Sequence, residues 1–492
     1  MRKVLKAVAV AIGALLIVGA VMYQFFGLRV VLDGGGVPHL RFVQPSDRQA
    51  EQIERHRQTQ RAASAVPPGV NQPAAVAPAP RADEGAADST AATTPVKTAT
   101  PDGSAIYWHE FRGPNRDGDY GNTPILTNWP ADGLTPIWKQ PIGAGYASFV
   151  AASGRAFTIE QRGPQEVVAA YDVATGRELW TNAWPAEFRE SMGGDGPRAT
   201  PTWHDGRLYA LGATGELRAL DDASGRVIWR TNILTDNGAN NLAWGMAAAP
   251  LIVDETVIVL PGGPNGRSVV GYNRATGQRV WSALNDQQAY ASPMLVTLTG
   301  VRQILVVSAT RLMGLTPSDG TLLWEYPFAT YNGINASQPL VVGDNRVFIS
   351  SSYGAGAAML ELSRGAGGNI TVREVWRNNR MKNRFSSSVL QKGIIYGLDE
   401  AILAAMDAET GELKWKGGRY GYGQVLLAGD RLIVLTEDGD LALVRATPER
   451  HEEVTRFPVL EGKTWNVPAL AGGYLLVRNL SEMAAFDLRL SR

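Results

Sequence analysis

The sequence predicts an all-β chain in which eight four-stranded blades close into a β-propeller over residues 134–492. Two observations support this fold class. A unit of strand, glycine-containing turn, strand and tryptophan recurs about every 40–50 residues, the length of one blade. The last copy of the unit ends before its final strand, and a solitary strand precedes the first copy. We therefore expect a ring that both ends of the domain close together.

The recurring unit is clearest in AYDVATGRELW, residues 170–180. Its glycine permits the positive φ that a tight hairpin turn needs. A seventh copy ends at Phe457 and has lost its glycine, and an eighth begins at Ala484. The tryptophans at the ends of the other copies are Trp180, Trp229, Trp281, Trp324, Trp376 and Trp415.

The solitary strand LTPIWKQPI carries Trp138 where the unit has its tryptophan, one period before Trp180. It can therefore supply the strand that the eighth blade lacks. Closure of this kind protects the edges that an open sheet would expose to other chains. We predict that this N-terminal strand completes the last blade.

Residues 7–26 carry no charge and have about the length that a membrane-spanning helix needs. The basic residues among positions 1–6 should stay in the cytoplasm. These features predict a single-pass protein of the inner (cytoplasmic) membrane with its C-terminal domain in the periplasm or outside. The alternative is a cleaved signal peptide, because residues 18–20 fit a small-residue cleavage site.

Three segments separate the predicted anchor from the propeller. Residues 27–61 suggest a small juxtamembrane hairpin, at 28–42, followed by a polar helical run. Residues 62–102 are rich in Ala and Pro and predict a disordered spacer between membrane and propeller. Residues 103–133 form a lead-in, which we expect to pack on the outside of the propeller.

Composition excludes several classes of function. The chain has 47 basic and 47 acidic residues, so we expect no nucleic-acid partner. It has no cysteine, which excludes disulfides, thiolate zinc sites, covalent c-type haem and a cysteine nucleophile. Its five histidines lack the spacing of metal ligands, and no Gly-x-Ser-x-Gly elbow occurs. The sequence therefore predicts no catalytic residue and no metal ligand.

Ligands of propellers usually bind at the central channel, which the innermost strand of each blade lines. The starts of these strands align in motifs such as YASF, RATP, YASP and WNVP. The ring either fills the tapered centre or forms a shallow pocket for an anionic, planar or peptide-like ligand, with arginines as charge partners. The residues that this alignment places at the channel mouth are Tyr146, Arg198, Trp244, Tyr290, Asn335, Arg384, Phe385, Tyr422 and Trp465.

The pattern formed by Asp172, Thr175, Gly176 and Trp180 resembles the pyrroloquinoline-quinone (PQQ) repeat of the quinoprotein alcohol dehydrogenase-like propeller superfamily. The lead-in FRGPNRDG is similar to one that precedes PQQ-like propellers of bacterial proteins. The resemblance implies that the repeat tryptophans dock between neighbouring blades, a task that suits their large buried area. These docking residues would be Trp138, Trp180, Trp229, Trp281, Trp324, Trp376 and Trp415.

The superfamily implies two functions. Its dehydrogenases stack PQQ against a tryptophan and, in many members, a vicinal disulfide, hold calcium and use an aspartate base. This chain has no cysteine and no clear match to the calcium and base motifs. The other branch is an outer-membrane assembly scaffold without a cofactor, although here an anchor helix replaces the lipoprotein cysteine.

We therefore expect a membrane-anchored scaffold that needs no cofactor and binds envelope proteins or a small ligand at the channel. The alternative is a dehydrogenase that uses PQQ with calcium to oxidise an alcohol or a sugar.

Overall fold

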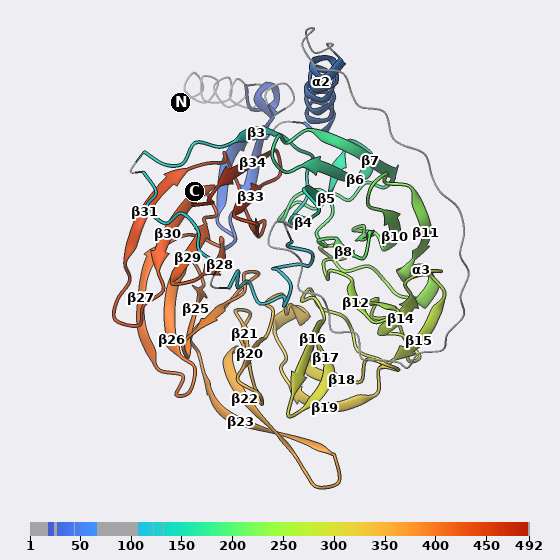
Figure 1. Ribbon diagram of the computed structural model, residues 1–492, viewed down its shortest axis with the longest axis vertical. Coiled ribbons are helices and arrows are strands. Elements are labelled where there is room, and N and C mark those ends of the chain that lie inside the picture. Colours follow the sequence, from blue (N-terminus) through green and yellow to red (C-terminus); the bar gives the residue numbers. More distant parts are fainter. Residues whose placement is uncertain are drawn as a thin grey trace, which may run out of the picture.

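The computed structural model describes residues 18–23, 27–43, 45–65, 107–121, 123–130 and 132–490. Eight four-stranded antiparallel sheets are arranged as blades around a central axis (Figure 1). The predicted all-β, eight-bladed propeller is therefore confirmed. Helices α2 (Ser46–Ala65) and α3 (Ile233–Asn237) and the 3-10 helix η1 (Tyr331–Gly333) lie outside these sheets.

Blades 1 to 4 follow the chain in order. Their strands are β4 (Val150–Ala152), β5 (Arg155–Arg162), β6 (Gln165–Asp172) and β7 (Glu178–Pro185); β8 (Thr202–His204), β9 (Arg207–Leu211), β10 (Glu216–Asp221) and β11 (Val227–Asn232); β12 (Leu251–Val253), β13 (Thr256–Val259), β14 (Val269–Asn273) and β15 (Arg279–Ala283); and β16 (Met294–Leu298), β17 (Val301–Val307), β18 (Arg311–Leu315) and β19 (Leu322–Pro327).

Blades 5 to 7 repeat the same order, and blade 8 has three consecutive strands. They are β20 (Leu340–Val342), β21 (Arg346–Ser351), β22 (Gly356–Arg364) and β23 (Ile370–Asn378); β24 (Val389–Gln391), β25 (Ile394–Asp399), β26 (Ile402–Asp407) and β27 (Leu413–Arg419); β28 (Gln424–Ala428), β29 (Arg431–Leu435), β30 (Asp440–Arg445) and β31 (Glu453–Pro458); and β32 (Ala469–Ala471), β33 (Tyr474–Arg478) and β34 (Glu482–Asp487).

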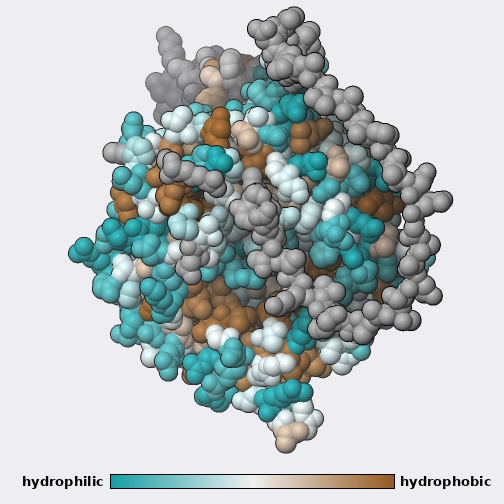
Figure 2. Space-filling model, viewed as in Figure 1, coloured by the Kyte–Doolittle hydropathy of each residue, from teal (hydrophilic) through white to brown (hydrophobic). Residues whose placement is uncertain are grey.

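Strand β3 (Trp138–Pro141) completes blade 8, whose order is β3-β34-β33-β32. It runs antiparallel to β34, with Trp138 opposite Ala485 and Pro141 opposite Glu482. The predicted closure by an N-terminal strand is thus correct. Figure 2 shows polar side chains along much of the rim of the closed disc, with separate apolar patches between them.

The repeat motif has a local and a tertiary task. The carboxylate of Asp172 accepts hydrogen bonds from the backbone N (2.9 Å) and the Oγ1 (2.8 Å) of Thr175, which fixes the turn. Gly176 follows with φ +70°. A Cβ at Gly176 would lie 2.7 Å from the ring of Trp138 in blade 8. The glycine therefore allows the backbone conformation of the turn and also leaves room for the tryptophan ring of the preceding blade.

The same contact recurs around the ring. Trp180 of blade 1 lies against Gly225 of blade 2, where an added Cβ would come within 2.4 Å of its ring. Most repeat tryptophans also donate their Nε1 hydrogen to a carbonyl of the next blade. These bonds are Trp138 to Val173 (2.8 Å), Trp180 to Asp222 (2.9 Å), Trp229 to Arg274 (2.9 Å), Trp376 to Ala408 (3.0 Å) and Trp415 to Thr447 (2.7 Å).

Two tryptophans depart from this pattern. The buried Nε1 of Trp281 has no hydrogen-bond partner among the described residues, although its ring lies against Gly320. Trp324 donates within its own blade, to Gln303. The turn that Trp324 would meet in blade 5 is expanded between β22 and β23.

The N-terminal segment contacts the propeller directly. Strands β1 (Leu28–Leu32) and β2 (Pro38–Phe42) form a hairpin that runs from the rim toward the centre of the disc (Figure 1). Residues 18–23 are helical, and the rest of the predicted anchor lies outside the described residues. No helix within the described ranges is both long and apolar enough to cross a membrane.

Helix α2 packs on the closing strand β3. Arg57, which is 1% exposed, donates to Oε1 of Gln140 (2.8 Å) and to the carbonyl of Pro141 (3.0 Å). Gln49 donates to the carbonyls of Ile142 (2.8 Å) and Leu480 (2.6 Å). Residues 62–65 of the predicted linker belong to α2, and residues 66–102 lie outside the described residues. The β1–β2 hairpin and α2 therefore both lie against the propeller.

The lead-in crosses the channel, so the prediction that it packs outside the propeller is wrong. Trp108 pairs with Ala151 in β4, and Tyr120 donates its N–H to the carbonyl of Leu427 in β28 (2.8 Å). Arg112 and Arg116, each 1% exposed, donate to backbone carbonyls near the starts of inner strands. Carbonyls that converge on the axis need donors, and two guanidinium groups supply them.

Candidate functional site

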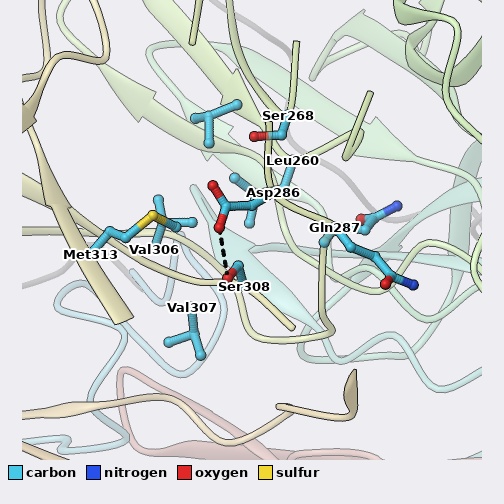
Figure 3. A pocket seen from close by; sticks show the side chains of 10 residues that line it. Leu260, Ser268, Asp286, Gln287, Val306, Val307, Ser308 and Met313 are labelled. Atoms are coloured by element: carbon cyan, nitrogen blue, oxygen red, sulfur yellow. Dashed lines mark hydrogen bonds between the residues drawn. The ribbon is translucent and has the colours of Figure 1, made fainter. Parts of the chain in front are cut away.

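A small cavity lies between blades 3 and 4, lined by Asp286, Ser308 and neighbouring apolar side chains (Figure 3). Its volume is about 10 Å³, room for about one water molecule. Asp286 accepts hydrogen bonds from Ser308 (3.2 Å) and from Arg311 (2.7 Å). This cavity is part of the packing between blades and cannot hold a small-molecule ligand.

The channel mouth brings four of the predicted residues into one aromatic row. Tyr146 of blade 1 stacks on Trp465 of blade 8, with ring centroids 5.3 Å apart and planes inclined by 27°. Phe385 lies 4.4 Å from Trp465 and 5.9 Å from Tyr422. Each ring precedes an inner strand, and the ring of blades therefore turns the four side chains toward one another. The row forms an apolar platform with polar edges.

Three other predicted residues lie apart from this row. Trp244 and Tyr290 form an edge-to-face pair at 5.8 Å. Asn335 is 2% exposed, and its amide donates to the carbonyls of Ser308 (2.9 Å) and Phe328 (3.1 Å). The side chain of Asn335 is therefore directed into blade 4 and does not join the aromatic row.

Both predicted charge partners are already engaged. Arg198 donates to the carbonyl of Gly194 (2.6 Å) and lies 4.6 Å from the ring centroid of Phe188; burial lowers its pKa. Arg384 lies over the ring of Tyr422 (5.1 Å) and 3.8 Å from the carboxylate of Glu400. The arrangement therefore favours rigid positioning of both arginines over capture of a free anion.

Sequence reasoning missed two charged residues at the mouth. Glu437, which is 8% exposed, accepts hydrogen bonds from Nε1 of Trp465 (2.9 Å) and from the backbone N of Tyr422 (3.1 Å). Lys463 lies 4.1 Å from the ring centroid of Trp465, and burial lowers its pKa to about 8.

Lys463 could have been predicted to lie at the mouth, because it stands two residues before Trp465 in the sequence. Glu437 lies in the turn between β29 and β30, which shares no register with the inner strands, so no sequence pattern marks it.

The β1–β2 hairpin reaches this site with its tip. The backbone N of Gly34 donates to Oε1 of Glu437 (2.6 Å), and Lys463 donates to the carbonyl of Leu32 (3.3 Å). Between the N-terminal segment and blades 1, 2 and 8 lies a cleft of about 1240 Å³. Arg29 and Arg41 line it on the hairpin side, and Glu461 on the side of blade 8. The cleft continues the channel mouth toward the rim.

The residues at the mouth do not fit PQQ with calcium. Calcium takes six to eight oxygen ligands, typically with several carboxylates. No group of three or more His, Cys, Asp or Glu residues that could hold a metal ion exists in the part of the chain described. Both oxygens of Glu437 already accept N–H donors. The aromatic row could stack on a planar ring, but the donor set for the metal is not there.

Structural neighbours share this fold at low sequence identity. The crystal structure of BamB from Moraxella catarrhalis covers 73% of this chain and 99% of its own, with a TM-score of 0.50 and 17% identity. The quinohemoprotein alcohol dehydrogenase from Comamonas testosteroni covers 78% of this chain and 81% of its own, with a TM-score of 0.56 and 13% identity. Both kinds of protein are thus built on a similar propeller.

Curated relatives are all of one kind. The outer membrane protein assembly factor BamB of Bordetella pertussis is 23% identical over 314 residues, which cover 61% of this chain and 72% of the relative. That of Burkholderia pseudomallei is 23% identical over 363 residues, which cover 64% and 89%. A model of the family described as outer membrane protein assembly factor BamB matches residues 164–417, from blade 1 to blade 6 and just over half of the chain. The chain therefore belongs to the BamB family of PQQ-like β-propellers.

Proposed function

We propose that the chain is a membrane-held scaffold that binds partner proteins of the cell envelope at the face carrying the channel mouth. The observation that supports this best is the aromatic row, beside which Lys463 lines a cleft of about 1240 Å³. The relatives are named as outer membrane protein assembly factors, which agrees with partners in the envelope. The proposal requires no cofactor and no catalytic group.

The shape and chemistry of the mouth favour a protein partner. Aromatic side chains with satisfied polar edges provide large contact area at low entropic cost, as in many protein interfaces. The charged groups around the row are held by internal partners, so they can orient backbone groups of a ligand without rearranging. A compact anionic ligand would need a free cation, whereas Arg198 and Arg384 are engaged.

The membrane part of the proposal rests on the uncharged residues 7–26 and the basic residues before them. We propose a single-pass anchor in the inner membrane with the propeller on the outer side. Because the hairpin and α2 contact the propeller, the channel mouth would lie close to the bilayer. The anchor predicts that the chain stays in membranes after an alkaline wash. A mature chain that begins after Ala20 would show a cleaved signal peptide instead.

Site-specific photo-crosslinking in cells tests the scaffold function. Glu461 is exposed and lines the cleft, so a photoreactive residue there should capture envelope proteins. A matched position is Val280 on the outer strand of blade 3, which is 58% exposed. We expect the crosslinks from position 461 to disappear in a Phe385→Ala background. Equal capture from both positions would contradict a specific site at the mouth.

A second measurement addresses the dehydrogenase alternative. The purified chain is mixed with PQQ and calcium, and binding and dye-linked oxidation of alcohols and sugars are followed. We expect neither saturable binding nor turnover. Tight binding with turnover would overturn the cofactor-free scaffold.

A further inference from the structure

The tip of the β1–β2 hairpin is a preformed turn. The carboxylate of Asp33 accepts hydrogen bonds from the backbone N of Gly35 (2.9 Å) and of Val37 (2.8 Å). The N–H of Gly36 donates to the carbonyl of Asp33 (2.9 Å). The remaining N–H at the tip, that of Gly34, thus points outward to a partner.

Side chains at the channel mouth contact this turn mainly at the turn's own backbone atoms. Glu437 accepts the N–H of Gly34 at 2.6 Å, a charge-assisted hydrogen bond. Lys463 approaches the carbonyl of Leu32 at 3.3 Å and also donates to that of Met192 (2.8 Å). Any chain that offered an N–H and a carbonyl in the same turn geometry would meet the same two groups.

A steric limit adds selectivity. A Cβ on Gly34 would lie 2.5 Å from the Cβ and 2.3 Å from the Cγ of Tyr422. These atoms are at the root of the side chain, so rotation of the ring cannot remove them. The φ angle of Gly34 is not in the left-handed region, so alanine would be excluded by contact with Tyr422 and not by backbone strain. The mouth therefore accepts only glycine at this point of the turn.

The hairpin is held mainly at its tip. On its outer face, Val30, Leu40 and Phe42 are 62%, 70% and 67% exposed. Near the tip, an ion pair joins Arg41 to the exposed Asp438 at 3.0 Å, and exposed pairs stabilise little. Few contacts must therefore break for the tip to leave Glu437 and Tyr422. A bound segment with a small attachment and a defined recognition geometry can be exchanged for a competitor.

We infer that the channel mouth is a binding site for glycine-bearing β-turns, that the Asp33–Gly36 turn is its intramolecular ligand, and that a partner protein displaces this ligand with a turn of its own. The inference rests on the proposed function, in which partners bind at the mouth. It adds the chemistry of the partner segment: a tight turn with a free N–H on a glycine. The docked hairpin then keeps the site closed until such a partner arrives.

A peptide competition experiment tests the inference on the full chain. The probe is a fluorescent hairpin peptide with the sequence of residues 28–42, and the substitution Gly34→Ala in the protein expels its own tip. Because a tethered ligand acts at an effective concentration in the millimolar range, the wild-type chain should bind the probe weakly. We expect at least tenfold tighter binding to the Gly34→Ala chain. The matched protein control is Leu40→Ala, which alters only an exposed side chain and should behave as wild type.

The probe itself carries the second control. A peptide with alanine at the position of Gly34 should not bind the Gly34→Ala chain, because the site is unchanged and still excludes a Cβ. Equal affinity of both peptides, equal affinity of the probe for wild-type and Gly34→Ala chains, or absence of binding would overturn the inference. Crosslinking from position 461 tests the proposed function separately and does not depend on these peptides.

Discussion

The seams between blades and the mouth of the channel are built on opposite principles. At the seams the same parts recur: a tryptophan ring covers the turn glycine of the next blade, as Trp138 covers Gly176 and Trp180 covers Gly225. At the mouth the side chain at the start of the inner strand varies from blade to blade, as Tyr146, Phe385 and Trp465 illustrate.

A repeated contact is what closing a ring requires, whereas recognition of a ligand requires differences between blades. We therefore expect substitutions at the seams to change stability and substitutions at the mouth to change binding.

The largest effect is expected at a seam between blades 1 and 2. Trp180→Ala removes a mostly buried ring and its hydrogen bond to the carbonyl of Asp222, so the free energy of unfolding should fall by about 3–5 kcal/mol. Denaturant titration of the full chain measures this loss.

Phenylalanine at the same position separates packing from hydrogen bonding. Trp180→Phe should cost only about 1 kcal/mol for the lost Nε1 bond, in addition to a small change in packing. Trp281→Phe provides the comparison, because the Nε1 of Trp281 has no hydrogen bond to lose within the part of the chain that the structure describes. A larger loss at Trp281 than at Trp180 would contradict the seam as described.

The same seam contains a buried acid. Glu166 is 0% exposed and accepts a hydrogen bond from the N–H of Ala213 in blade 2, at 2.8 Å. Burial raises its pKa from 4.5 to about 7. The folded chain therefore keeps this proton longer than the unfolded chain, and stability falls as the pH rises from 4.5 to about 7.

Glutamine imitates the protonated acid at every pH. Glu166→Gln should therefore be more stable than the wild type by up to about 3 kcal/mol above pH 7, and about equally stable below pH 4.5. Unfolding titrations across this pH range measure the difference. The same difference at all pH values would mean that the acid does not titrate in this window.

A pair of glycines in blade 1 isolates the ring contact from the turn. Both Gly176 and Gly154 have positive φ, +70° and +75°, but only Gly176 lies under a tryptophan. Alanine should cost about 1 kcal/mol at Gly154, from backbone strain alone. At Gly176 the ring of Trp138 must also move, so we expect a loss about 1–2 kcal/mol larger. Equal losses would show that the glycine serves only the turn.

The contacts at the seams could be predicted from the sequence more completely than those at the mouth, and the reason is physical. The pattern from Asp172 to Trp180 is local and repeats, so its period predicts the blades, and the missing last strand predicts that Trp138 closes the ring. The row of Tyr146, Phe385, Tyr422 and Trp465 followed from aligning inner strands.

The contacts that complete the site join segments far apart in the chain. Glu437 meets Gly34 across 403 positions, and Arg116 of the lead-in reaches the carbonyl of Pro293. No periodicity marks either contact. Aligned strands also do not predict the direction of a side chain. The alignment of the inner strands predicts Asn335 at the mouth, whereas hydrogen bonds direct its amide into blade 4.

The smallest effect on stability is expected at the mouth. Trp465→Phe keeps an aromatic ring between Tyr146 and Phe385 but removes the bond from Nε1 to Glu437. Because Glu437 keeps the N–H donors of Gly34 and Tyr422, the free energy of unfolding should change by about 1 kcal/mol or less.

The same substitution leaves Oε1 of Glu437 with the N–H of Gly34 as its one remaining donor and so loosens the orientation of the carboxylate. Capture of envelope proteins from position 461 should therefore fall severalfold. If the aromatic row only fills the tapered centre of the ring, the opposite result is expected. Trp465→Phe will then lower the free energy of unfolding by more than Trp180→Phe does, and capture of envelope proteins will not change.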